Sequence, residues 1–225
     1  MDKVATARFV WRFLSPLPFM WRLHQVVRSL LSPFAAVIAA IALQPVEDDR
    51  KLLDLGCGHG VFLALAKQAF PGLGLIGIDL SESKIASARV AFEAAGLEAR
   101  ELAVRDIADF AQQSVDVISI LDVLYLAPIE QWDGILGNCY ACLRPGGLLL
   151  LKEMNRAIDW KFRLLCLEET LAVKVLGLTL GEKFTFPFPD EIRARLERAG
   201  FDVEQKALDR GYYVPHMLWI ARKPA

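Results

Sequence analysis

The strongest constraint on the fold is a regular alternation of short apolar runs with stretches of helical length from residue 51 onward. The runs cover 51–55, 74–79, 97–104, 115–121 and 147–152, and the helix-like stretches between them include 60–69, 82–95 and 129–142. This alternation indicates crossover units, which build a parallel sheet with helices on both faces. Further on, "PDEIRARLERAG" predicts an amphipathic helix, and "FDVEQKAL" and "YYVPHMLWIAR" predict two final strands. We therefore expect an α/β fold.

The length of 225 residues suits one domain rather than two. We divide it into an N-terminal helical extension, residues 1–47, and a main domain, residues 48–225. The apolar stretch at about 156–182 interrupts the alternation and has no tight turn until Gly177, so it predicts an inserted helical cap after the fifth strand.

The N-terminal extension is both basic and aromatic. Asp2 is the only acid before Glu47, whereas four arginines are interleaved with aromatic residues: Arg8, Arg12, Arg22 and Arg28 with Trp11, Phe13, Phe19 and Trp21. Its longest uncharged stretch is broken by Pro33 and is shorter than a spanning helix requires, and its arginines are unlike a signal peptide. Two interpretations remain open. Residues 1–44 make peripheral contact with a membrane interface, or they form a pair of helices that cover the main domain as a lid, and both can hold together.

Charge and cysteine content bound the partners and the compartment. The formal net charge is −1, so no overall basic field favours nucleic acid. The cysteines at 57, 139, 142 and 166 include one CxxC pair, but no second pair or histidine cluster completes a zinc site. We expect no metal, and a reducing, cytoplasmic location, at most peripheral to the inner face of a membrane.

A glycine-dense turn follows the first predicted strand. The stretch "LLDLGCGHG", residues 52–60, places Gly56, Gly58 and Gly60 behind an apolar run. Glycine permits positive φ and close approach of the backbone to a ligand, and turns at the carboxyl ends of such strands bind ligands. A NAD-binding turn, GxGxxG, would need a glycine at position 61, where this chain has Val61. The turn argues against a dinucleotide, although the later Asp79 would suit an adenosine ribose.

This turn resembles the first motif of the class I S-adenosylmethionine-dependent methyltransferases. "GIDLS", "VRD", "DVISILDVLYL" and "LRPGGLLLLKE" match later parts of the family pattern, so that the resemblance covers residues 48 to 222. It implies a Rossmann-like, seven-stranded, mostly parallel sheet with helices on both faces and an antiparallel last strand. It also implies S-adenosylmethionine as cofactor, with Asp79 on the ribose hydroxyls and Asp106 on the adenine amino group. The implied cofactor-binding residues are Asp54, Gly56, Cys57, Gly58, Gly60, Asp79, Leu80, Asp106, Ile107 and Asp122.

The two residues between the glycines of the turn, Cys57 and His59, are not expected to take part in the chemistry. Cys57 is expected to be a small turn residue rather than a nucleophile. His59 is expected to border the cofactor or to cap the next helix, rather than to act as a base.

Methyl transfer is an in-line displacement that depends on alignment and exclusion of water. Catalytic candidates are therefore expected at the carboxyl ends of the fourth and fifth strands and in the cap, which hold Asp122, Tyr125, Lys152, Glu153, Asn155 and Trp160. Asp122 and Glu153 are the best-placed acids for base or orientation work. Tyr125 and, in the last strand, His216 complete the catalytic set.

The apolar character of the extension and the cap favours a hydrophobic small-molecule or lipid-like acceptor. "LDVLYL" resembles small-molecule and lipid methyltransferases, and "GYYVPHMLWIARKP" with "KEMNRAIDWKF" is similar to enzymes of aryl-polyene pathways. After the fourth predicted strand the chain lacks an NPPY-like tetrad, which is expected in enzymes that methylate amides or exocyclic amines of proteins and nucleic acids. Two alternatives stay open: methylation of a soluble small acid or phenol, and a non-catalytic cofactor-binding partner subunit.

Overall fold

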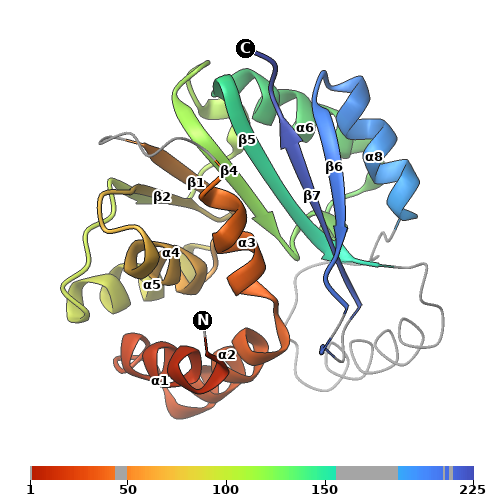
Figure 1. Cartoon of the computed structure of the whole chain (residues 1–225). Helices are drawn as coiled ribbons and strands as arrows, with labels where there is room; N and C mark the ends of the chain where they lie inside the picture. Colours follow the sequence, from red (N-terminus) through yellow and green to blue (C-terminus); the bar gives the residue numbers. More distant parts are fainter. Residues whose placement is uncertain (1, 44–49, 156–186, 210, 213–214) are drawn as a thin grey trace.

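The computed structural model describes residues 2–43, 50–155, 187–209, 211–212 and 215–225. The predicted cap at 156–182, with Trp160, lies outside the described residues, as does the predicted boundary at 47–48. A single sheet carries the fold (Figure 1), in the order β3-β2-β1-β4-β5-β7-β6. The strands are β1 Lys51–Leu55, β2 Gly74–Ile78, β3 Glu101–Ala103, β4 Val115–Leu121, β5 Leu143–Met154, β6 Asp202–Ala207 and β7 His216–Arg222.

The direction of the strands agrees with the predicted topology. The first five strands form parallel pairs, and β7 pairs antiparallel with both β5 and β6. The chain leaves β1 toward β2 and β3 and then returns to β4 and β5 on the other side. The switch point between β1 and β4 is therefore at the carboxyl edge of the sheet, where open α/β sheets bind ligands.

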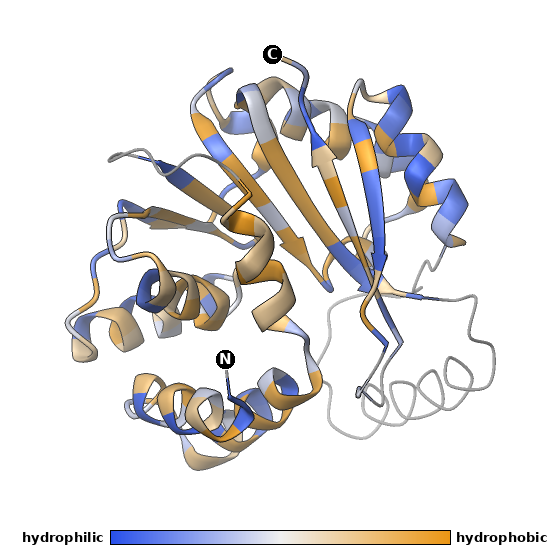
Figure 2. Cartoon of the chain, viewed as in Figure 1, coloured by the Kyte–Doolittle hydropathy of each residue, from blue (hydrophilic) through white to orange (hydrophobic). Residues whose placement is uncertain are grey.

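Helices cover both faces of the sheet. In the main domain they are α4 Val61–Ala69, α5 Glu82–Ala94, α6 Ile129–Cys142 and α8 Pro189–Arg198, with short 3₁₀ turns η1 Ile107–Asp109 and η2 Leu124–Leu126. Each face of the sheet has its own hydrophobic core. Successive side chains of a strand point to opposite faces, so β5 contributes to both cores: Leu148 and Leu150 belong to the core with α4 and α5, whereas Leu149 and Leu151 belong to the core with α6 and α8. The continuous apolar colour of the central strands in Figure 2 is typical of a sheet buried on both sides.

The N-terminal extension forms three helices rather than the expected pair: α1 Lys3–Phe13, α2 Phe19–Leu31 and α3 Phe34–Ile41. α2 and α3 are separate helices because Pro33, in the sequence "LSPFAAV", lacks the N–H that a continuous helix needs. α1 and α3 bury Phe13, Val37 and Ile41 in the core shared with α4 and α5, and the ring of Phe13 lies edge-on to Phe92 at 5.4 Å. The extension is therefore packed into the main core, and α2 is its most exposed helix.

Three strands, β3, β5 and β7, begin four residues away from the predicted position, and β7 begins at His216 rather than at 212. β5 begins at Leu143 instead of 147, because Leu143, before the Pro145–Gly146–Gly147 segment, already pairs with Val115 of β4, with a register shift between Val115 and Val117. β3 is shorter than predicted and covers only 101–103.

Candidate functional site

The glycine turn connects β1 to α4 at the switch point. The backbone N–H groups of Gly56 and Cys57 donate to the carbonyl of Ile78 at 2.8 and 2.9 Å, so that the turn is fixed to the end of β2. All three glycines have positive φ, which side chains rarely adopt. A Cβ on Gly56 would lie 2.6 Å from Val123, and one on Gly60 would lie 2.8 Å from Phe92, whereas one on Gly58 would meet no atom within 4 Å. Gly56 and Gly60 are therefore required by packing, and Gly58 is open to a ligand.

Asp79 connects the turn to the end of β2. Its carboxylate accepts from the backbone N–H of Gly58 at 3.0 Å and from that of Ser81 at 2.8 Å, one at each oxygen. A carboxylate oxygen can accept more than one hydrogen bond, so Asp79 retains capacity for hydroxyl donors. The neighbouring Leu80 is 77 % exposed, which places a large apolar side chain in the open beside this carboxylate.

Asp54 lies beneath the turn, where it is almost completely buried. The hydroxyl of Ser119 on β4 donates to its Oδ1 at 2.6 Å. Burial raises the pKa of Asp54 to about 7. The Ser119 hydrogen bond lowers this pKa, and the nearby charge of Asp79 raises it further. Asp54 therefore joins β1 to β4 below the turn. Its partner Ser119 is 65 residues away along the chain, so no local sequence pattern predicts this contact.

Two further predicted cofactor residues flank η1. Asp106 is exposed and caps η1, since its Oδ1 accepts from the N–H of Ala108 at 2.9 Å. The side chain of Ile107 is buried in the core on the α6 side, beneath Asp106. Cys57 is also buried, and burial raises the pKa of its thiol, so that it lacks the thiolate of a nucleophile.

The acidic and basic candidates gather where β4 and β5 end and where the antiparallel β7 begins. Lys152 has no exposed surface, donates to Oδ2 of Asp122, and lies 3.3 Å from Nδ1 of His216. Nε2 of His216 lies 3.2 Å from the carbonyl of Leu31 at the end of α2. Since a carbonyl only accepts, Nε2 carries the proton, and the bare Nδ1 accepts from Lys152. We call Asp122, Lys152 and His216 the buried triad.

Asp122 stands out within the buried triad. Its φ of 55° is unusual for a residue other than glycine, and its Oδ1 has no hydrogen-bond partner among the described residues. Burial would raise the pKa of Asp122, but the charge of Lys152, with a further contribution from Arg28, lowers it, so that the carboxylate is ionised. Burial lowers the pKa of Lys152, and the charge of Asp122 opposes this.

Glu153 follows Lys152 and faces the start of η2. Its Oε1 accepts from the backbone N–H of Leu124 at 2.7 Å and from that of Val123 at 3.2 Å, while Oε2 has no partner among the described residues. Burial and the charge of Asp122 raise the pKa of Glu153 to about 8. The two neighbouring acids therefore differ in protonation at neutral pH, as acids in different local environments can. Tyr125, in η2, is buried beside them.

His59 completes the edge and faces the N-terminal helices. Its imidazole is 7 % exposed, and its ring lies 5.6 Å from that of Trp21 on α2. Neither ring nitrogen has a hydrogen-bond partner among the described residues, and Gly60, rather than His59, is the N-cap of α4. Burial lowers the pKa of His59 to about 4. The expectation that His59 caps the next helix is therefore wrong, and it remains a neutral, buried imidazole beside the turn.

The CxxC pair is structural. Cys139 and Cys142 are buried in the core between α6 and the sheet, and burial raises the pKa of both thiols. Among the described residues, no group of three or more histidine, cysteine, aspartate or glutamate side chains could hold a metal ion.

The sheet order, the glycine turn at the switch point and the acids after β2 and β3 define the class I methyltransferase fold. A family model described as "Methyltransferase domain" matches residues 24–206, which is most of the chain. The chain belongs to this family, and by family and fold it is a class I S-adenosylmethionine-dependent methyltransferase.

Several known proteins are similar to the chain. A tRNA N(3)-methylcytidine methyltransferase, Mettl2, of Drosophila melanogaster is 30% identical over 210 residues, 86% of this chain and 62% of its own length. A demethylmenaquinone methyltransferase of Thermus thermophilus is 27% identical over 79% of this chain and 86% of its own length. The apo structure of the S-adenosylmethionine-dependent methyltransferase SibL superposes with a TM-score of 0.71 at 23% identity, covering 94% of this chain and 61% of SibL. The chain thus spans less than two thirds of the first and the third of these proteins.

Proposed function

We propose that this chain transfers a methyl group from S-adenosylmethionine to a hydrophobic small-molecule or lipid-like acceptor. The observation that carries the proposal is the position of α2. Trp21 of α2 contacts His59 beside the cofactor turn, and the Leu31 carbonyl contacts His216 beside the buried triad. α2 therefore lies along the edge at which the acceptor must bind, and most of its exposed residues are apolar.

The turn residues fit the cofactor. Gly58 leaves open space for a ligand against the backbone, and Asp79 would accept from two ribose hydroxyls. Leu80 would supply apolar contact near the adenine, whereas Ile107, whose side chain is in the core, would support the adenine site from beneath. Asp106 would face the adenine amino group, while Asp54, Gly56, Cys57 and Gly60 would shape the turn. S-adenosylmethionine supplies an electrophilic methyl group on a sulfonium.

At the acceptor end, the two acids have separate roles in this proposal. Asp122, with a lowered pKa and an unpartnered Oδ1, would accept a hydrogen bond or a proton from an acceptor hydroxyl. Glu153, neutral at pH 7, would hold η2 and Tyr125 in place and present Oε2 to the acceptor. His216 would orient Asp122 through Lys152 rather than act on the acceptor itself.

The extension is proposed to act as a cover, and peripheral contact of residues 1–44 with the inner face of a membrane belongs to the same proposal. The named activity of the Thermus relative, on demethylmenaquinone, supports an apolar acceptor. An aryl or polyene-type intermediate would fit the same site. A soluble small acid or phenol is the alternative, because Asp122 and Glu153 would serve a phenol equally well.

The test compares lipid extracts of cells with and without this protein by mass spectrometry. We expect one organic-soluble compound that is heavier by one methyl group only in cells with the protein. A methylated compound confined to the aqueous phase would favour the soluble acid or phenol. No methylated product in either phase, despite binding of S-adenosylhomocysteine, would favour a non-catalytic partner subunit, and methylated RNA would contradict the acceptor class.

A further inference from the structure

α2 carries an apolar surface that the rest of the chain does not cover. Besides Trp21, five of its large apolar residues are exposed by 40 to 69 %: Phe19, Met20, Leu23, Val27 and Leu31. Residues 19, 23 and 27 are spaced as i, i+4 and i+8, and residues 20, 27 and 31 are spaced as i, i+7 and i+11. With this spacing all five side chains share one face of the helix. We call these five residues the α2 stripe. A continuous apolar surface of this kind marks an interaction site rather than ordinary exposed side chains.

The opposite face of α2 is the one that packs. Ser29 is buried, and Val26 packs against the core shared with α4 and α5. The packed face and the α2 stripe therefore point in different directions. α3 is not part of this surface, because its Val37 and Ile41 are buried in the core. Among the described residues, no single helix is long and apolar enough to cross a membrane. α2 and α3 taken together reach the required length and apolar composition, but the pair is bent by 68°.

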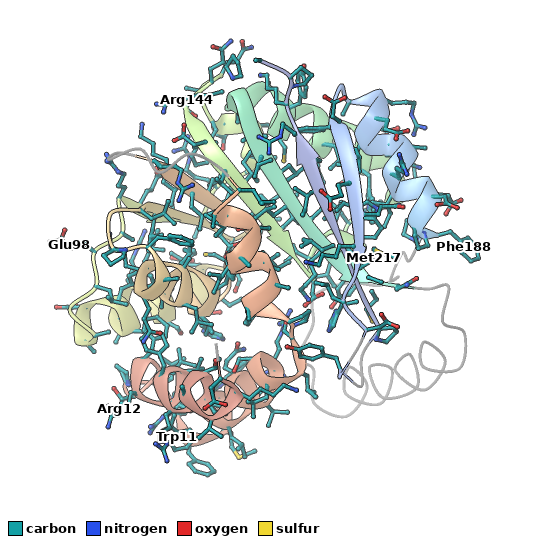
Figure 3. The ribbon with its side chains drawn as sticks, viewed as in Figure 1. Trp11, Arg12, Glu98, Arg144, Phe188 and Met217 are labelled. Carbon is teal, nitrogen blue, oxygen red and sulfur yellow. The ribbon has the colours of Figure 1, made fainter. Side chains whose placement is uncertain are left out.

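The stripe continues onto α1 through an aromatic and basic cluster. The ring of Trp11 lies edge-on to Phe19 at 5.6 Å, and the guanidinium of Arg22 stacks on the same indole at 3.9 Å. Trp11 and Arg12 project away from the sheet at this end of the molecule (Figure 3). Trp and Phe with nearby arginines are typical of helices that lie in a membrane interface.

Charge identifies the kind of partner. Residues 2–43 contain five basic residues, Lys3, Arg8, Arg12, Arg22 and Arg28, and one acid, Asp2, which caps α1. The whole chain has a net charge of −1, so this positive charge is local to the N-terminal helices. Basic side chains near an anionic bilayer each add favourable free energy that salt screens.

We infer that the α2 stripe docks on an anionic lipid surface, with α2 lying in the plane of the interface. One flank of the same helix holds Trp21 against His59, and its last carbonyl holds His216. α2 thus separates the membrane from the acceptor end of the sheet, and a membrane-dissolved acceptor reaches Asp122 along this helix. The docking rests on the stripe and the charge alone, whereas the delivery of the acceptor rests on the proposed function.

Two valines provide a matched pair of variants. Val27 on α2 is 47 % exposed, and Val90 on α5 is 49 % exposed and outside the stripe. Val27→Glu and Val90→Glu make the same change in charge, size and polarity in a helix. Both variants should bind S-adenosylhomocysteine as the full wild-type chain does, which shows that they fold and keeps cofactor binding separate from docking.

The experiment is sedimentation of the full chain with vesicles of phosphatidylcholine alone or mixed with phosphatidylglycerol. We expect the wild type and Val90→Glu to pellet with anionic vesicles at low salt and less at high salt. Val27→Glu should partition about tenfold more weakly, because a carboxylate replaces a lipid-buried valine.

Three results would overturn the inference: a wild-type chain that stays in the supernatant with anionic vesicles at low salt, equal pelleting of the two variants, or a wild-type dimer that Val27→Glu dissociates without any vesicle binding. The last result would assign the stripe to a second copy of the chain. Vesicle binding without any binding of S-adenosylhomocysteine would contradict the proposed function and leave the docking intact.

Discussion

Lys152 and Asp122 form an ion pair between the ends of β5 and β4, and the ammonium group of Lys152 is completely buried. β4 and β5 are adjacent parallel strands, so Asp122 and Lys152 meet where both leave the sheet. A buried ion pair is a weak source of net stability, but removal of one partner leaves the other charge unpaired. Lys152 therefore matters chiefly because Asp122 is ionised beside it.

The Lys152→Met variant tests this relationship. We expect it to lose about 3–5 kcal/mol in the free energy of unfolding, because a carboxylate is left without its counter-charge. Urea unfolding measures the loss, and Lys206→Met, at an exposed position of β6, is the control. The double variant Lys152→Met with Asp122→Asn should recover part of the loss, since Asn carries no charge. Equal stability of Lys152→Met and Lys206→Met would show that the pair is unimportant.

The openness of Gly58 predicts a specific loss of cofactor binding. Gly58 and Gly96 both have positive φ, 54° and 60°, and neither has an atom within 4 Å of a Cβ position. Gly58→Val and Gly96→Val should therefore suffer comparable backbone strain. Only Gly58→Val should abolish binding of S-adenosylhomocysteine in calorimetry, because its side chain fills the space that the ligand needs. Normal binding by Gly58→Val would mean that this glycine serves the turn alone.

Asp79 is expected to supply the strongest polar contact to the ribose. Asp79→Ala should weaken binding of S-adenosylhomocysteine by at least about 100-fold, which corresponds to about 2.7 kcal/mol and to the loss of two charge-assisted hydrogen bonds. Asp109→Ala, at an exposed position of η1, provides the comparison. An Asp79→Ala protein that binds with wild-type affinity would remove this carboxylate from the cofactor site.

Glu153 predicts a pH dependence of stability. Its folded pKa, about 8, is above the ordinary value of 4.5, so the folded protein binds more protons than the unfolded chain between these values. Stability from this group is complete below about pH 4.5 and is lost as pH rises through about 8. Glu153→Gln cannot ionise, and its free energy of unfolding should fall less than that of the wild type between pH 5 and pH 9. Parallel curves for the two proteins would contradict the raised pKa.

The sequence predicts the central fold well where the signal is local. Strands 51–55 and 115–121 and helix 129–142 have the bounds expected from hydrophobic pattern and flanking turns. The cofactor turn is also predictable, because its three glycines lie within five consecutive residues and their spacing argues against a dinucleotide turn.

The acceptor end was harder to predict, because its contacts join residues distant in the sequence. Asp122, Lys152, His216 and Leu31 meet only after the sheet order brings β4, β5 and β7 together. The lysine in "LLLLKE" was the one local signal, since a charged residue at the end of a buried strand needs a partner. The sequence allows helices that cover the main domain, but not the burial of α1 and α3 in its core, because apolar residues in the extension do not reveal which surface they cover.

The most direct test of the central claim uses purified full chain, S-adenosylmethionine tritiated on its methyl group, and a total lipid extract. We predict that tritium enters the organic phase with the wild-type chain and that Gly58→Val transfers none. In parallel reactions with tRNA or with water-soluble small molecules in place of the lipid extract, we expect no labelled product. Tritium in tRNA or in a water-soluble product, with the organic phase unlabelled, would contradict a hydrophobic acceptor.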